Sequence, residues 1–261
     1  MLRDNQKNPE YFEALIPQYL EAIESIEQEL ADDSITLPDE KTQAANDVFE
    51  LRLMCAIACY SSGEPLEELK PHATKILEAK KLYINTANTL PPRQKTYRQQ
   101  FEAISGDNQP PEIHGITRYI NALWWLSLVV ATGQTKAHCL EVLSCIGCRG
   151  EDALLDRIAI ALSDDNKVQA ENLLYPHLYR DLFKVFDTPK NECHLSIQRF
   201  LKDWYSGCWQ ASWYNNHAKE NEQEGNWDYY FGYWSLEAVL VVNLLGLDDS
   251  EFNQHRYYPA D

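Results

Sequence analysis

The cysteines around Cys145-Ile-Gly-Cys148, which follow His138-Cys139, are the residues whose type and spacing most suggest chemistry. Paired thiolates of this spacing hold zinc when a second pair completes a tetrahedron. They serve thiol–disulfide exchange when they follow a strand of a thioredoxin-like unit. The sequence offers neither a second pair nor a strand pattern. We therefore interpret these thiols, and likewise Cys55 and Cys59, as small apolar residues on or near helices, and we expect no metal and no cofactor.

Three aspartate pairs, at 32–33, 164–165 and 248–249, are the next candidates for binding a divalent metal. A helical enzyme that handles a diphosphate through Mg²⁺ needs a further carboxylate one helical turn later, and the following residues do not supply it. Helix ends and caps explain the pairs better. A glycine-rich phosphate loop and a nucleophile elbow are also missing. A helical hydrolase that acts through a carboxylate–metal site stays an alternative, although the spacing of these residues gives it no support.

The stretch 204–234 differs from the rest of the chain because it holds eleven aromatic residues in 31 positions. Within it, residues 215–228 form an acidic segment in which Lys219 is the one basic side chain. Aromatic anchors beside unpaired carboxylates are typical of a surface that binds a basic protein. The candidate binding residues are Trp213, Tyr214, Glu220, Glu222, Glu224, Trp227 and Asp228. The alternative is that the aromatic residues pack the C-terminal core and the acidic segment is only solvated.

The elements that position these residues are expected to be helices. Glycine is scarce while Leu, Ala, Glu and Gln are plentiful, which favours helices over strands. Apolar residues recur at steps of three or four from Phe12 onward, and Asn8-Pro9 is a typical helix start. Pro17 should kink or restart this first helix, whereas Gly63 and Gly246 fit helix ends. We predict an all-α protein, an irregular helical bundle or stack of helical hairpins with about 8–11 helices.

A polar, proline-rich stretch at 85–111 separates two expected parts. The N-terminal helical part covers 1–110, and the C-terminal helical part, with the aromatic region, covers 111–261. The first helix of the second part carries Trp124-Trp125-Leu126, which makes it apolar on nearly every side. A helix of this kind belongs at the centre of a fold.

The chain of 261 residues has 40 acidic and 23 basic side chains and a net charge of −17, shared between both parts. This charge argues against nucleic acid as a partner, because phosphate needs a positive surface, and it disfavours an anionic membrane surface. The longest apolar run, 122–131, is too short to cross a bilayer. The N-terminus has no apolar signal core and the seven cysteines are odd in number, so we expect a reduced, cytoplasmic protein.

Several segments together carry a family resemblance. At the C-terminus they are Tyr230-Phe-Gly-Tyr-Trp-Ser-Leu-Glu-Ala-Val239, Leu244-Leu-Gly-Leu-Asp-Asp-Ser250 and Tyr257-Tyr-Pro259. Further matches are Leu2-Arg-Asp4, Tyr11-Phe12, Tyr60-Ser-Ser-Gly63 and the apolar residues 119–128. In these segments the chain resembles the PoNe immunity proteins (PoNi), which are inhibitors of a family of bacterial polymorphic nuclease toxins.

The resemblance implies an all-helical inhibitor without enzymatic activity. Its partner would be a cognate toxin of the PD-(D/E)xK nuclease type, which cuts DNA with a divalent metal and is delivered between bacteria by contact-dependent secretion. The producing cell would keep the inhibitor in its own cytosol. A DNase presents a cationic groove to the phosphate backbone, so a protein of charge −17 would be drawn to that groove. It would cover the active site or the DNA path.

Some signature residues are interpreted as structural, because the surface that faces a toxin must differ between cognate pairs. They are Tyr233, Trp234, Glu237, Asp248, Asp249 and Ser250. We expect Trp234 in the core, Glu237 in a buried hydrogen-bonding role, and residues 248–250 as a cap after the last helix. The competing interpretation is a helical adaptor or regulator that binds another basic protein. The aromatic content leaves self-association open.

Overall fold

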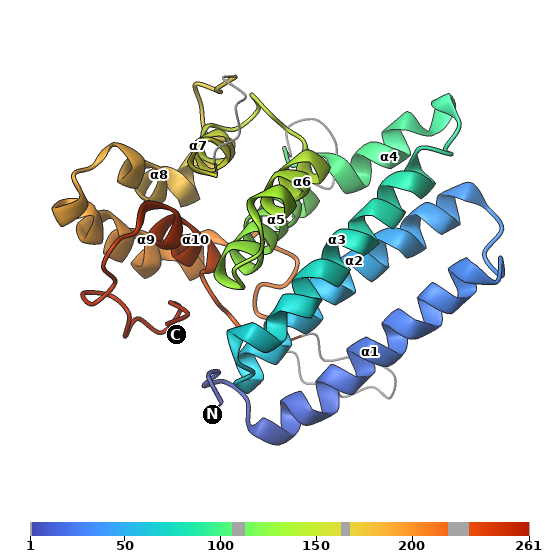
Figure 1. The fold of residues 1–261 in the computed structure, drawn as a ribbon, viewed down its shortest axis with the longest axis horizontal. Helices are drawn as coiled ribbons and strands as arrows, with labels where there is room; N and C mark the ends of the chain where they lie inside the picture. The colour runs from blue at the N-terminus through green and yellow to red at the C-terminus, as the bar shows by residue number, and fades with distance from the viewer. Residues whose placement is uncertain (1, 106–112, 163–167, 219–229, 261) are drawn as a thin grey trace. The chain divides into compact units, whose positions relative to one another are not determined.

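The computed structural model describes residues 2–105, 113–162, 168–218 and 230–260 (Figure 1). Within these ranges it contains ten α-helices, four short 3₁₀ helices and no strand. The predicted all-α class and the predicted number of helices are confirmed.

The chain divides into two compact units, and neither is one continuous stretch of sequence. Unit 1 comprises Met1–Ala103 and Asn215–Gly232, and unit 2 comprises Ile104–Tyr214 and Tyr233–Asp261. The first break lies near the polar stretch that separated the expected parts 1–110 and 111–261. Unit 1 differs from the expected N-terminal part in that it also includes the segment Asn215–Gly232. Its backbone carbonyls at Tyr230 and Phe231 accept hydrogen bonds from Tyr11 Oη (2.9 Å) and Ser61 Oγ (2.7 Å).

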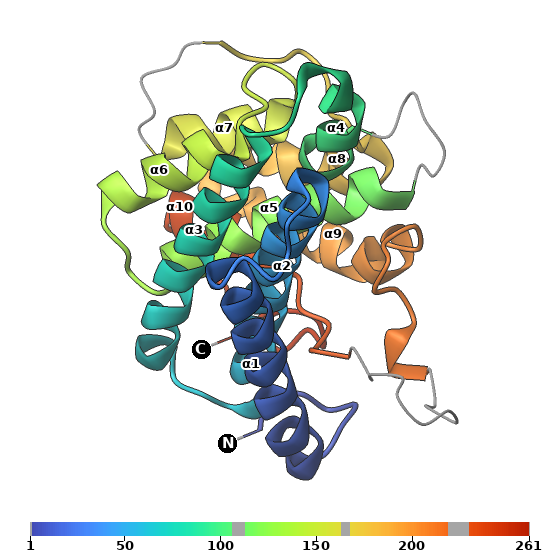
Figure 2. The same cartoon turned by 90° about the vertical axis from the view of Figure 1, so that its right-hand side faces the viewer.

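Unit 1 is built on three long helices, α1 (Pro9–Ala31), α2 (Pro38–Ser62) and α3 (Leu66–Ala87), followed by the short α4 (Lys95–Glu102). Helix α2 packs against both α1 and α3, and the three lie side by side in both views (Figures 1 and 2). The Asn8 side chain caps α1 by accepting from Tyr11 N, and Gly63 ends α2 in a left-handed conformation with φ 101°. Pro17 lies inside α1 without restarting it, so the predicted restart is wrong. Residue 17 is exposed, and water can therefore satisfy the carbonyl that loses its partner.

The core of unit 1 follows the predicted helical spacing. Phe12, Leu15, Tyr19 and Ile23 are the buried residues of α1. Near the ends of α3 and α4, Tyr83 packs edge-on against Phe101, with ring centroids 6.1 Å apart. These contacts hold the hairpins of unit 1 together.

Unit 2 contains α5 (Ile113–Ala131), α6 (Lys136–Ile146), α7 (Ala153–Ala161), α8 (Pro176–Lys184), α9 (Cys193–Gly207) and α10 (Leu236–Leu245). Helix α5 packs against α10 and α6, and α8 packs against α9. Gly246 ends α10 with φ 58°, as the sequence predicts.

The most apolar long helix, α5, is the centre of unit 2. Trp124, Trp125 and Leu126 are each at most 1% exposed, so the expected central position is confirmed. No helix in the described parts of the chain is both long enough and apolar enough to cross a membrane.

Candidate functional site

The signature residue Glu237 lies at the centre of a buried hydrogen-bond network in unit 2. Its Oε1 accepts from the indole Nε1 of Trp204 (2.6 Å) and from the hydroxyl of Tyr179 (3.2 Å). Its Oε2 accepts from the indole Nε1 of Trp124 (2.9 Å). The carboxyl is fully buried, and three helices, α5, α8 and α9, supply the donors. Glu237 therefore joins these helices to α10.

Burial raises the pKa of Glu237 to about 7, because a carboxylate loses its hydration inside the unit. The hydrogen bonds from the backbone, the two indoles and the phenol act in the opposite direction and favour the charged form. With its pKa near neutrality, the group changes its protonation state within the physiological range.

Large aromatic rings pack around this network. Trp213 stacks on Trp204 with centroids 5.9 Å apart and also packs against Trp124 at 5.2 Å. Tyr205 stacks on Tyr214 at 4.7 Å and on Tyr257 at 5.3 Å. The aromatic region of the sequence is thus largely the core of unit 2.

Of the seven expected toxin-binding residues, two lie in the described ranges, and these two differ in burial. Trp213 is 3% exposed, so its ring packs in the core and offers no surface to a partner. Tyr214 is half-buried. Glu220, Glu222, Glu224, Trp227 and Asp228 lie outside the described residues.

Among the described residues of the stretch 204–234, the exposed aromatic side chain is that of Trp209, just after α9. It is 61% exposed, the largest fraction among the exposed large hydrophobic side chains of the described ranges. Trp209 and Trp213 are four residues apart, but α9 ends at Gly207, so helical periodicity no longer decides which ring faces solvent. The sequence prediction named Trp213 as an anchor, whereas the exposed ring in the structure is that of Trp209.

The remaining signature residues lie as follows. Tyr233 and Trp234 are buried, at 5% and 8% exposure. Asp248 accepts from the backbone N–H of Ser250 (3.1 Å) and from its hydroxyl (3.0 Å), and the backbone bond in particular lowers the pKa of Asp248. Asp249 accepts from the Tyr258 hydroxyl at 3.2 Å. Residues 248–250 thus shape the turns that follow α10.

The N-terminal segments of the resemblance meet the C-terminal Tyr230 within unit 1. The buried Asp4 accepts from the backbone N–H groups of Gln6 (2.8 Å) and Lys7 (2.9 Å) and from the hydroxyl of Tyr230. Arg3 donates to the carbonyls of Tyr60 (2.9 Å) and Glu64 (2.7 Å). Residues far apart in the sequence therefore fix the N-terminus against the α2–α3 turn.

Asp152, which sequence reasoning did not single out, is a second fully buried carboxylate of unit 2. It accepts from the Tyr119 hydroxyl (2.7 Å) and from the backbone N–H groups of Leu155 (2.9 Å) and Leu174 (2.8 Å). An aspartate directly before Ala-Leu-Leu is a helix N-cap pattern, and that signal could have identified it. Burial and the Asp152 charge raise the pKa of Tyr119.

A surface that sequence reasoning also missed is the outer face of α1. The helix carries six glutamates and no lysine or arginine, and residues 8–40 contain ten acidic side chains and no basic one. Glu10, Glu13, Glu21, Glu24 and Glu29 are exposed. Leu20, 45% exposed, lies four residues before Glu24 and seven after Glu13, on the same helical face. This run of acidic residues can be read from the sequence, but the net charge summed over each half of the chain does not show it.

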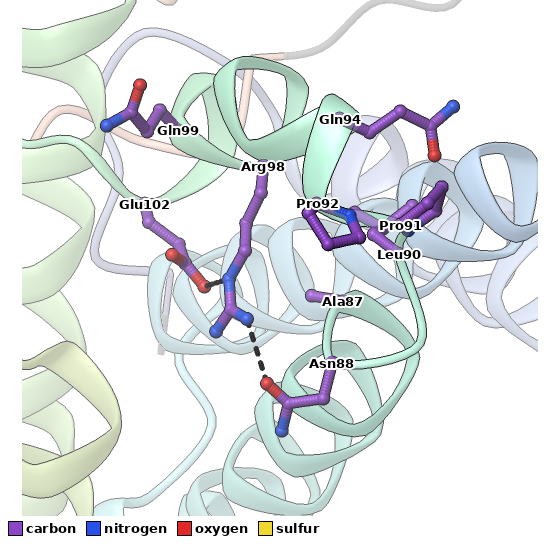
Figure 3. Close-up of a pocket in the computed structure, with 9 residues that line it drawn as sticks. All are labelled: Ala87, Asn88, Leu90, Pro91, Pro92, Gln94, Arg98, Gln99 and Glu102. Carbon is purple, nitrogen blue, oxygen red and sulfur yellow. Dashed lines mark hydrogen bonds and ion pairs between the residues drawn. The ribbon is translucent and has the colours of Figure 1, made fainter.

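A pocket of about 480 Å³ lies in unit 1 between the end of α3, Pro91-Pro92 and α4 (Figure 3). Arg98 crosses its wall, where its Nε donates to Glu102 (2.7 Å) and its Nη1 donates to Asn88 (2.8 Å). Because this guanidinium is already paired, the pocket gives no reason to expect a charged small-molecule ligand.

Residues 150–261 match the family model described as PoNe immunity proteins (PoNi), C-terminal. The C-terminal part of this chain is therefore similar to the PoNi proteins. The resemblance seen in the sequence is confirmed, and the matched region contains the Glu237 network except for Trp124. PoNi proteins are inhibitors rather than enzymes, so the match supports an immunity role for this chain, with a cognate toxin as its partner.

The fold is also similar to a solved structure, the crystal structure of protein PA2201 from Pseudomonas aeruginosa. The TM-score is 0.71 at 17% sequence identity, and the alignment covers 98% of this chain and 87% of that one. At this identity the likeness concerns the fold alone. A comparison with curated proteins gave no match.

Proposed function

We propose that this chain neutralises a DNA-cleaving toxin in the cytosol of the producing cell by covering the cationic surface that the toxin uses for DNA. The PoNi match supports the immunity role, and the resemblance to inhibitors of nuclease toxins supports the nuclease. The observation that carries the proposal is the acidic outer face of α1, with its five exposed glutamates.

The charge on α1 is suited to a nuclease. A protein that holds DNA must offer lysine and arginine side chains along the phosphate path. A helix with exposed carboxylates and no basic residue attracts the same surface and accelerates encounter with it. The carboxylates therefore compete with phosphate for the same groups.

Apolar anchors add to this electrostatic attraction. Leu20 is exposed within the acidic face of α1, and Trp209 is the exposed aromatic residue after α9. Binding energy in protein interfaces concentrates in such large apolar side chains, while surrounding charges give specificity and speed. The carboxylates at 220, 222, 224 and 228, with Trp227, remain predicted contacts of the same kind.

The function is tested in cells that produce a candidate cognate nuclease toxin. Co-production of the intact chain should preserve chromosomal DNA and viability, while cells without it should degrade their DNA. Survival with intact chromosomes only when the chain is present supports neutralisation of a nuclease. Toxicity that leaves DNA intact, or DNA loss despite the chain, would contradict the proposal and favour an adaptor for another basic protein.

A further inference from the structure

Three potential metal ligands converge in unit 1 at the point where α2 turns into α3. Cys55 and Cys59 lie on α2 and His72 lies on α3. Their ligand atoms, two Sγ and one imidazole nitrogen, all lie within 4.8 Å of one another. Cys55 and Cys59 are 1% and 3% exposed and His72 is half-buried, so the cluster opens to solvent on the imidazole side.

The local fold explains why these groups meet. Residues 55 and 59 are one helical turn apart, so both thiols lie on the same face of α2. Gly63 ends α2 with φ 101° and lets the chain reverse into α3, which brings His72 back beside them. The turn is held by Arg3, which donates to the carbonyls of Tyr60 and Glu64.

The two thiols are not arranged for a disulfide. Residues four apart on a helix have Cβ atoms about 5–6 Å apart. A disulfide requires a Cβ separation of about 3.5–4.5 Å, so the bond would need movement of the backbone. A metal ion bridges such a pair without that movement, because it stands between the two sulfur atoms.

We propose that Cys55, Cys59 and His72 form a zinc-binding site that joins α2 to α3. Zinc binds thiolate at about 2.3 Å and imidazole at about 2.0–2.1 Å, so ligand atoms around it stand roughly 3.8 Å apart. Rotation of the three side chains can shorten the distances between the ligand atoms from those in the structure, which are at most 4.8 Å, to those around a zinc ion. Two thiolates and an imidazole are a donor set that suits zinc and excludes hard cations such as Mg²⁺. The proposal departs from the expectation that Cys55 and Cys59 only fill the core.

The surroundings are consistent with metal binding. Burial lowers the pKa of His72, which favours the neutral imidazole. The hydrogen bond from the Cys59 thiol to Cys55 lowers the pKa of Cys55 and, together with burial, raises the pKa of Cys59, so a zinc ion must displace the Cys59 proton as it binds. The Glu64 side chain interacts with the Cys59 thiol, so its carboxylate or a water can fill the fourth position of the tetrahedron.

The proposal is tested with the full-length chain purified under reducing conditions and stripped of metal. Titration with Co²⁺ should give one equivalent of binding, with thiolate-to-cobalt charge-transfer absorption and the intense visible bands of a tetrahedral site. Zn²⁺ should then displace the cobalt and raise the midpoint of thermal unfolding.

Variants locate the site. Two variants are made, the double variant Cys55→Ser/Cys59→Ser and the milder His72→Gln. Each should weaken metal binding by more than about 100-fold, because mutation of residues that only hydrogen-bond to metal ligands already costs about 10–100-fold in affinity. The matched control, Cys145→Ser/Cys148→Ser, removes two half-buried thiols outside the cluster and should bind as the unmodified chain does. Circular dichroism shows whether each variant is folded. Failure of the unmodified chain to bind either metal, or unchanged binding by folded His72→Gln, overturns the proposal.

Discussion

The indole nitrogen of Trp204 lies 2.6 Å from Oε1 of Glu237, and this hydrogen bond joins α9 to α10 inside unit 2. Trp124 and Tyr179 donate to the same carboxyl, which is fully buried. A buried acid with three donors is costly to place inside a protein and costly to remove once it is there. Removal of the Glu237 carboxyl should therefore destabilise unit 2 strongly.

This network predicts a dependence of stability on pH. The pKa of Glu237 is about 7 when folded and 4.5 as an isolated side chain, so the folded state binds the proton more tightly. The corresponding stabilisation is full below pH 4.5 and is lost as the pH rises through 7. Between pH 6 and pH 8 the chain should lose about 1 kcal/mol of unfolding free energy from this group.

Urea denaturation at pH 6 and pH 8 measures the effect, and both values lie above the isoelectric point of about 4.8. The side chain of the Glu237→Gln variant cannot ionise. Its amide also places a donor against an indole N–H, which should lower the free energy of unfolding by about 1–3 kcal/mol at pH 6. The difference between the unmodified chain and this variant should shrink by about 1 kcal/mol at pH 8. A difference that is the same at both pH values would show that Glu237 does not titrate in this range.

Substitution by alanine should reduce the stability of the chain strongly at Trp213 and hardly at all at Trp209. Trp213→Ala removes a buried ring and should destabilise the chain by about 3–5 kcal/mol. Trp209→Ala removes an exposed ring and should change stability by less than about 0.5 kcal/mol. If Trp209 anchors the toxin, its loss should weaken toxin binding by about 30-fold, the equivalent of about 2 kcal/mol. Equal destabilisation by both substitutions would contradict the assigned positions.

The contact between Asp4 and Tyr230 should be measurable as a coupling energy. Tyr230→Phe removes one hydroxyl donor, and Asp4→Ala removes the acceptor of that hydroxyl and of two backbone N–H groups. A double-mutant cycle in urea should give a coupling of about 1.5–3 kcal/mol, as expected for a hydrogen bond to a buried charged group. Strictly additive effects would mean that the N-terminus is not held by this bond.

The acidic face of α1 should control the speed of toxin capture. Glu13→Gln/Glu21→Gln/Glu24→Gln removes three exposed charges, and the association rate at low salt should fall by about tenfold or more. High salt should abolish the difference, because it screens the charges. The matched control, Glu78→Gln/Glu151→Gln/Glu171→Gln, removes the same charge from other exposed positions and should have a much smaller effect. Equal loss in both variants would indicate that only net charge matters.

Much of the fold could be predicted from local sequence. Gly63 and Gly246 end helices in the left-handed conformation that glycine favours, and the apolar α5 lies at the centre of unit 2. The grouping of residues 215–232 with the N-terminal helices could not be predicted. It depends on contacts such as Tyr11 with Tyr230, which are 219 residues apart and leave no periodic signal.

The candidate site was harder to predict than the fold. Composition showed that residues 204–234 are rich in aromatic side chains, but not which rings face inward. The end of α9 at Gly207 removes the helical rule that would have decided between Trp209 and Trp213. The convergence of Cys55, Cys59 and His72 likewise needs the α2–α3 turn, since Cys59 and His72 belong to different helices.

The central claim, neutralisation of a DNase by this acidic chain, is tested most directly by DNA cleavage with a purified candidate cognate nuclease toxin. The chain is added from substoichiometric amounts to one molar equivalent, at low and at high salt. Cleavage should stop near one equivalent, and substituting the three α1 glutamates should slow the onset of inhibition at low salt. Undiminished cleavage at a molar excess of folded chain would contradict the central claim.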